Sequence, residues 1–244
     1  MSCCPDNSWG SLIANPDYSP KGKVLQLEDL PIYVAGKSEK CLLWSYHIFG
    51  FNDGRGKQLC DMLADQGYMV VMPDYYRGKS QDPTLPGAKD FLMSETQWPK
   101  LKKDIESLVV PWAKEQGAKI FGAIGTCWGS YVVLRISSHP DFKAGVSLHP
   151  SHTILMSLMN DDERVILEGL KGTPQMFAPA GNDHENVKPG GLGQKYLGDD
   201  LTIVEFPEMK HGWTVRGDLK EPGVEEATIR AMKEAVTFFK KHLK

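Results

Sequence analysis

The sequence lacks long hydrophobic runs and a strong excess of either charge. No stretch of its 244 residues approaches the ~20 consecutive apolar residues that a membrane-spanning helix needs. The 28 basic and 31 acidic side chains give a formal net charge of −3, and no long segment is strongly basic. A nucleic-acid partner would need such a basic segment. We therefore expect neither a membrane nor a nucleic acid as a partner.

Cysteine is scarce and its number is odd. The five cysteines are Cys3, Cys4, Cys41, Cys60 and Cys127. Such a set does not make a disulfide framework, so free thiols and a reducing, cytoplasmic location are expected. No basic segment followed by an apolar one, the mark of a secretory signal, opens the chain. Residues 1–4 could suggest a metal or lipid site, but a frayed terminus is favoured, and residues 1–20 are expected to be loosely ordered.

Apolar runs alternate with segments of helical periodicity through most of the chain. With 41% hydrophobic residues, the chain can bury one sizeable core, so residues 1–244 are expected to form a single domain. The expected strands cover residues 25–30, 31–35, 41–47, 68–72, 119–124, 144–148, 175–180 and 201–206, the first two as a hairpin. The expected helices cover residues 59–64, 98–113 with a kink at Pro111, 128–138 and 225–243.

Two further expectations concern the surface of this domain. The last helix should bury one apolar face, made by Ile229, Met232, Val236, Phe239 and Leu243. Residues 77–95 are expected to form a loop that covers the ligand pocket.

This alternation predicts an α/β fold of three layers, with a mostly parallel central sheet covered by helices on both faces. Parallel neighbours need crossover connections, and helices supply them. In such sheets, ligand chemistry lies at the carboxyl ends of the strands. The residues that directly follow each apolar run are therefore the candidates for a functional site.

The strongest candidate is Cys127, which lies in the run Gly125-Thr126-Cys127-Trp128-Gly129 between a predicted strand and a predicted helix. This is the pattern of a nucleophile elbow, with sulfur in place of the usual serine oxygen. The turn is sharp, so its flanking positions must lack a Cβ. The amino end of the following helix favours the reactive thiolate. The alternative is a glycine-rich turn that holds an inert, buried cysteine.

A base and an acid follow in the order that elbow hydrolases use. His211 comes directly after the last predicted strand and is the candidate base. Asp183 stands three residues past the strand at 175–180 and could orient that imidazole, with Glu185 as its local competitor. A metal site formed by residues 183–185 is disfavoured because no second cluster has ligand spacing. The backbone N–H of Trp128 and one from residues 47–50 are the candidates for an oxyanion hole.

Several motifs together resemble the dienelactone hydrolase (carboxymethylenebutenolidase-like) family of the α/β-hydrolase superfamily, in its eukaryotic branch. They are residues 48–50 (IFG), 72–78 (MPDYYRG), 125–129 (GTCWG), 148–150 (LHP), 181–184 (GNDH) and 211–216 (HGWTVR), together with the opening Cys3-Cys4-Pro5. The resemblance implies a triad of Cys127, His211 and Asp183, and oxyanion-hole amides on Trp128 and Ile48. It also implies hydrolysis of an enol-lactone without a metal or an organic cofactor.

One position departs from the family pattern. The bacterial members carry a glutamate that takes part in activating the cysteine, and this chain has His47 there. A histidine can hydrogen-bond the thiol or, when protonated, pair with the thiolate, or it can merely pack at the mouth of the site. The resemblance also implies that arginines bind the substrate carboxylate, and Arg77 and Arg216 are the candidates.

The sequence therefore predicts a cysteine hydrolase that cleaves a small, anionic lactone or activated ester through a thioester intermediate. The expected assembly is a monomer or a weak homodimer. Because His47 replaces the glutamate, a non-catalytic binding protein is the alternative. A glycan hydrolase is disfavoured, since no pair of carboxylates marks a glycosidic site.

Overall fold

One sheet of eight strands organises the protein. The structure is a computed structural model, and it describes residues 4–12, 18–80 and 86–244. The strands are β1 (Lys23–Leu27), β2 (Leu30–Ala35), β3 (Lys40–Ser45), β4 (Met69–Pro73), β5 (Ile120–Cys127), β6 (Phe142–Pro150), β7 (Gln175–Ala178) and β8 (Leu201–Ile203). Their order across the sheet is β1-β2-β4-β3-β5-β6-β7-β8. Every strand predicted from the sequence is present, with ends that differ by a few residues.

The sheet is antiparallel at one edge and parallel elsewhere. β2 pairs antiparallel with both β1 and β4, whereas β4, β3, β5, β6, β7 and β8 are parallel neighbours. The predicted opening hairpin is β1–β2. The central strands are buried on both faces, as continuous apolar runs such as β4 require. Parallel neighbours bring the carboxyl ends of β3, β5, β6 and β7 to one edge, where the candidate residues follow them.

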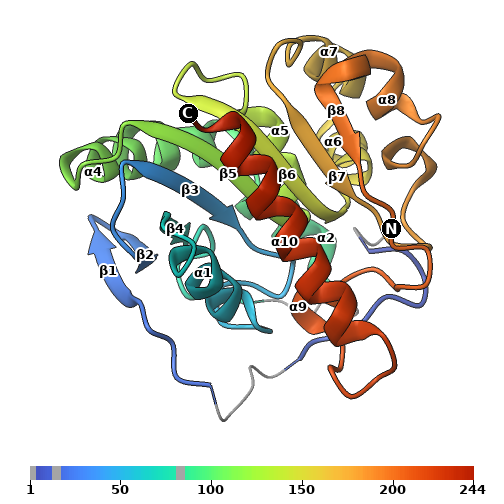
Figure 1. Ribbon diagram of the computed structural model, residues 1–244, viewed down its shortest axis with the longest axis horizontal. Coiled ribbons are helices and arrows are strands. Elements are labelled where there is room, and N and C mark those ends of the chain that lie inside the picture. Colours follow the sequence, from blue (N-terminus) through green and yellow to red (C-terminus); the bar gives the residue numbers. More distant parts are fainter. Residues whose placement is uncertain (1–3, 13–17, 81–85) are drawn as a thin grey trace.

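Helices cover both faces of the sheet. In Figure 1, α1 (Gly56–Ala64) and α10 (Val224–His242) lie in front of the sheet, and α5 (Gly129–Ile136) lies behind it. α5 packs on β3, β5 and β6, while α10 packs on β6 and β7. This arrangement confirms the predicted three-layer fold with a mostly parallel sheet. Among the described residues, no helix is both long and apolar enough to cross a membrane.

The buried face of α10 agrees with the predicted one except at Ile229. Met232, Phe239 and, directly after the helix, Leu243 are buried as expected, and Val236 is partly buried. Ile229 is 40% exposed. The helix also buries Ala231 and Ala235, whose small side chains let it approach the sheet closely.

The segment around Pro111 also departs from the prediction of one kinked helix. It consists of α3 (Trp98–Lys103), a π-helical stretch η1 (Asp104–Val109) and α4 (Val110–Glu115). Pro111 is the second residue of α4, where the missing N–H costs little. The wider turns precede the proline, so they accommodate it in place of a sharp bend.

Shorter helices escaped the sequence analysis because their apolar residues do not repeat over enough turns to show a period. They are α2 (Ala88–Glu95), α6 (His152–Met159), α7 (Glu163–Glu168), α8 (Leu192–Leu197), α9 (Trp213–Arg216) and the 3-10 turns η2 (Glu185–Val187) and η3 (Gly198–Asp200). α2 replaces the second half of the loop predicted at residues 77–95. Residues 81–85 of that loop lie outside the described residues.

Within residues 1–20, which the sequence predicts to be loosely ordered, residues 4–12 make hydrogen bonds to the rest of the protein, and residues 1–3 and 13–17 lie outside the described residues. The N–H of Trp9 donates to the carbonyl of His211 at 3.0 Å, and the N–H of Gly54 donates to the carbonyl of Leu12 at 2.8 Å. The side chain of Asn182 donates to the carbonyl of Asp6 at 2.9 Å. This amino-terminal segment is therefore attached to the edge of the sheet where the candidate residues lie.

Candidate active site

Cys127 occupies the strained turn that the sequence predicts. It is the last residue of β5, has a φ of 54° and is completely buried. That φ lies in the left-handed region, which a non-glycine residue adopts only when its surroundings enforce it. A Cβ on Gly129 would lie 2.2 Å from the carbonyl oxygen of Ser45, and one on Gly125 would lie 2.5 Å from that of Gly129. The two glycines therefore allow β3, β5 and α5 to meet at the sulfur.

His211 and Asp183 form a buried pair beside this turn. Nδ1 of His211 donates to Oδ1 of Asp183 at 2.5 Å, and neither side chain is exposed. The other carboxylate oxygen accepts the N–H of Ala180 at 2.7 Å, and the N–H of His211 donates to Oδ1 of Asn182 at 2.7 Å. These bonds fix the ring with Nε2 directed away from the carboxylate. The competitor Glu185 is exposed and pairs with Lys188 instead.

Ser151, which the sequence analysis did not single out, joins the histidine to the sulfur. Its Oγ lies 3.4 Å from Nε2 of His211 and 3.7 Å from Sγ of Cys127. Its N–H donates to the carbonyl of Cys127 at 3.1 Å. Ser151 directly follows β6, the neighbour of β5, so its place after a strand end was the available signal. The structure thus brings Cys127, His211 and Asp183 together at one edge of the sheet.

The surroundings of His211 favour its protonated form. Burial alone would lower the pKa of the imidazole, but the Asp183 carboxylate and the Cys127 sulfur outweigh that effect and hold the pKa well above its usual value. A charged imidazole next to a cysteine stabilises the thiolate. The arrangement can therefore supply both a sulfur nucleophile and a proton donor.

The structure places the two candidate arginines differently. Nη1 and Nη2 of Arg77 donate to the two carboxylate oxygens of Asp104, both at 2.9 Å, and its Nε donates to Asp29 at 2.7 Å. This guanidinium is committed to structural carboxylates, so the expectation that Arg77 binds substrate is not supported. The sequence could not reveal the pairing, because Asp29 and Asp104 come from distant segments.

Arg216 is the arginine that lies at the site. Its side chain is 1% exposed, and its Nε and Nη1 have no hydrogen-bond partner among the described residues. The guanidinium lies over the ring of Phe49, with 4.8 Å from Cζ to the ring centroid, and Nη2 lies 3.9 Å from Sγ of Cys4. A buried cation with free donors is costly unless an anion reaches it. Arg216 is therefore the better candidate for binding a negatively charged ligand, a role that stays a prediction.

His47 is buried and neutral. Its Nε2 lies 3.3 Å from the carbonyl oxygen of Asp53, and its Nδ1 has no hydrogen-bond partner in the part of the chain that the structure describes. Burial, together with the positive charge of Arg216, lowers its pKa to about 3. Near neutral pH, His47 therefore does not pair as a cation with a thiolate, which leaves hydrogen bonding or packing as its role.

The low pKa of His47 makes a prediction about stability in acid. In the unfolded chain His47 binds a proton below its ordinary pKa of 6.5, whereas in the folded protein it stays neutral down to about pH 3. Stability is therefore lost as the pH falls through this window, by about 1.4 kcal/mol per pH unit. We expect the change His47→Gln to remove this loss, about 2 kcal/mol between roughly pH 6.5 and 4.5. Urea unfolding at both pH values measures it, and an unchanged loss in the variant would contradict the prediction.

The residues expected to form the oxyanion hole lie on the two loops that flank the sulfur. Trp128 follows Cys127 and caps α5, and Ile48 is buried in the loop after β3. A Cβ on Gly129 would lie 2.8 Å from the carbonyl oxygen of Tyr46, so this loop packs directly against the elbow. The two residues thus lie on neighbouring segments, and an oxyanion hole formed by their backbone amides stays a prediction.

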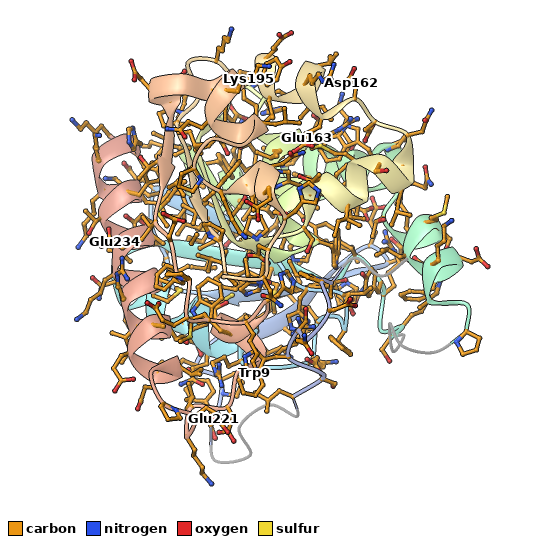
Figure 2. The ribbon with its side chains drawn as sticks, turned by 90° about the vertical axis from the view of Figure 1, so that its right-hand side faces the viewer. Trp9, Asp162, Glu163, Lys195, Glu221 and Glu234 are labelled. Carbon is orange, nitrogen blue, oxygen red and sulfur yellow. The ribbon has the colours of Figure 1, made fainter. Side chains whose placement is uncertain are left out.

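Cys4 also reaches the site, which the sequence analysis did not foresee. Its Sγ lies 3.5 Å from Sγ of Cys127, across 123 positions of sequence. The amino-terminal segment, which includes Trp9, brings Cys4 to Cys127. In Figure 2, Trp9 is labelled toward the bottom of the molecule and Glu163 of α7 toward the top. A local sequence pattern cannot predict a contact between residues that are 123 positions apart.

Comparison with known proteins gives consistent matches over most of the chain. The model of the dienelactone hydrolase family matches residues 35–243. A carboxymethylenebutenolidase homologue of Xenopus tropicalis is 31% identical over 217 residues, which cover 82% of this chain and 82% of that protein. The hydrolase tropI of Talaromyces stipitatus is 28% identical over 249 residues, covering 93% and 92%. The structure of a dienelactone hydrolase from Anabaena variabilis superposes with a TM-score of 0.63 at 16% identity, covering 93% of this chain and all (100%) of that one.

Proposed function

Because the chain belongs to the dienelactone hydrolase family and is an ester or lactone hydrolase, we propose that it cleaves its substrate by attack of the Cys127 sulfur. The observation that carries the proposal is the contiguous array at the edge of the sheet. Cys127 lies on a strained turn, the imidazole of His211 stands beside it, and Asp183 holds that imidazole at 2.5 Å. Nucleophile, base and orienting acid are the three parts that covalent acyl transfer needs.

The first half of the reaction forms a thioester. The Cys127 thiolate attacks the carbonyl carbon, and the amides of Trp128 and Ile48 stabilise the negative oxygen of the tetrahedral intermediate. The intermediate then expels the enolate or phenolate of the substrate, which takes a proton from the His211 imidazolium. Asp183 keeps the ring oriented and stabilises its positive charge beforehand.

The second half releases the acid and restores the thiolate. Neutral His211 removes a proton from a water molecule, which attacks the thioester carbon. The sulfur leaves as a thiolate beside the newly formed imidazolium. Ser151 lies between the two groups, 3.4 Å from the imidazole and 3.7 Å from the sulfur, and its hydroxyl can orient the attacking water.

The choice of substrate follows from the leaving group and from Arg216. A thiolate is itself a good leaving group, so the intermediate moves forward most readily when it can expel something comparable, such as an enolate. Activated esters and enol-lactones meet this condition better than amides and fatty-acyl esters do. The free donors of Arg216 add a preference for a substrate that carries a carboxylate.

The change Arg216→Met tests that preference. We expect kcat/KM for an anionic lactone to fall about 10- to 100-fold, which corresponds to losing a charge-assisted hydrogen bond. The loss should appear mainly in KM, and hydrolysis of neutral p-nitrophenyl acetate should change little. Arg77→Met is the matched control, because Arg77 is paired with Asp29 and Asp104. Equal losses for both substrates in Arg216→Met would contradict this role.

Acylation of the sulfur tests the proposed function directly. We expect p-nitrophenyl acetate to release a burst of p-nitrophenol stoichiometric with the protein, and mass spectrometry of the quenched enzyme to locate the acetyl group on Cys127. Cys41 and Cys60, which are also buried, serve as internal controls in the same peptide map. If no dienelactone or activated ester yields a burst or an acylated cysteine, the proposal fails and a non-catalytic role takes its place.

A further inference from the structure

Two thiols and an imidazole lie close together where the amino-terminal segment meets the elbow. Sγ of Cys4 is 3.5 Å from Sγ of Cys127, and these two atoms and a ring nitrogen of His211 all lie within 4.8 Å of one another. Three hydrogen bonds, through Asp6, Trp9 and Leu12, hold the segment in place. The cluster is thus built from a fixed segment and from two residues on the buried edge of the sheet.

The distance between the two sulfurs is close to that of two thiolates bound to one tetrahedral metal ion. Zinc binds thiolates at about 2.3 Å, so two thiolates on one ion are separated by roughly 3.8 Å. The observed 3.5 Å between the sulfurs is close to that separation. Thiolate and imidazole together select thiophilic cations such as Zn²⁺ over Mg²⁺ or Ca²⁺.

The surroundings also resemble those of a metal-binding histidine. Such a histidine donates its second ring nitrogen to a carboxylate, which fixes the tautomer, and His211 donates Nδ1 to Asp183 at 2.5 Å. Two thiolates and a neutral imidazole carry a charge of −2, which balances a divalent cation. The hydroxyl of Ser151, 3.7 Å from Sγ of Cys127, stands beside the position of a fourth ligand.

We propose that Cys4, Cys127 and His211 form an inhibitory site for a thiophilic divalent cation such as Zn²⁺. Binding forms two metal–sulfur bonds and one metal–nitrogen bond, and the protons of these groups pass to solvent. No oxidation is involved. The metal then binds the lone pair with which the Cys127 sulfur attacks the carbonyl and the lone pair with which His211 accepts a proton. Hydrolysis therefore stops until a chelator removes the ion. Binding follows from the geometry alone, whereas the inhibition rests on the proposed function.

Cobalt spectroscopy tests binding without relying on activity. In the presence of a phosphine reductant, Co²⁺ added to the full-length protein should give thiolate-to-cobalt charge-transfer bands and the visible bands of tetrahedral cobalt, at one equivalent. Cys4→Ser and Cys127→Ser should each weaken the charge-transfer bands, and Zn²⁺ should displace the cobalt. Cys3→Ser is the matched control, because the proposal assigns Cys3 no bond to the metal. Wild-type bands in either Cys4→Ser or Cys127→Ser would overturn the site.

Inhibition of hydrolysis by Zn²⁺ tests whether the metal site is inhibitory. Zn²⁺ should inhibit hydrolysis of p-nitrophenyl acetate, EDTA should restore it, and Cys4→Ser should raise the half-inhibiting Zn²⁺ concentration at least about tenfold. Each variant is compared with its own metal-free rate, and circular dichroism checks that it folds. Equal inhibition of wild type and Cys4→Ser would refute the assignment.

The two measurements separate the two proposals. An acetylation burst at Cys127 without cobalt–thiolate bands would leave the proposed function intact and overturn the metal site. Cobalt–thiolate bands that depend on Cys4 and Cys127, in a protein that hydrolyses no ester or lactone, would support the site and overturn the hydrolytic role of Cys127.

Discussion

Replacing Cys127 by alanine is expected to lower kcat/KM for activated esters by about 10³-fold or more. Without the sulfur no thioester forms, and only the oxyanion-hole amides and the binding contacts remain to accelerate attack by water. The measurement is steady-state hydrolysis of p-nitrophenyl acetate and of a dienelactone. Cys127→Ser is expected to be nearly as inactive, because a hydroxyl is much harder to deprotonate than a thiol.

Cys41→Ala is the matched control for this experiment. Cys41 is also a buried cysteine on a parallel strand, but it lies at the beginning of β3, at the opposite end from the elbow. We expect it to lose some stability through the small cavity and to keep its kcat/KM. Full activity in Cys127→Ala would show that another group is the nucleophile.

Replacing Asp183 by asparagine is expected to lower kcat by about 10³-fold, approaching the effect of the same change in serine proteases. The carboxylate accepts the proton on Nδ1 of His211 at 2.5 Å and is a main reason why the pKa of that histidine is raised. An asparagine amide can instead donate to Nδ1, which leaves the proton on Nε2. The imidazole can then neither accept a proton from Cys127 nor remain charged near neutral pH.

The dependence of kcat on pH measures how the change at Asp183 affects His211. In Asp183→Asn the pKa of His211 should fall, because burial is then opposed by the sulfur alone. Glu163→Gln provides the control, since Glu163 is another carboxylate next to a buried histidine, 3.5 Å from His152. If Glu163→Gln and Asp183→Asn reduced kcat equally, the loss would reflect folding and not the orientation of His211.

The elbow and its partners could be predicted from the sequence because their signals are local. Gly125 and Gly129 flank Cys127 at fixed spacing, and both are needed where backbones approach within contact distance. Asp183 and His211 follow apolar runs, and parallel strands bring their carboxyl ends to one edge. Periodicity and position along the chain were sufficient for these residues.

The two arginines show where such reasoning ends. Arg77 and Arg216 have the same chemistry, and each belongs to a family motif. What distinguishes them is the pair of carboxylates, Asp29 and Asp104, that folding brings to Arg77 alone. Cys4 is a similar case, because its neighbour is 123 positions away. Contacts between distant segments depend on side-chain packing, which leaves no periodic pattern in the sequence.

The close packing around Gly129 has a consequence for anyone who redesigns this enzyme. At position 127 an oxygen can replace the sulfur without crowding the turn, so the loss expected for Cys127→Ser is one of reactivity and not of packing. At position 129 even one added methyl group would collide with the main chain after β3. Mutant libraries aimed at new substrates should therefore keep the glycines and place their diversity at buried residues beside the site, such as positions 47 and 216.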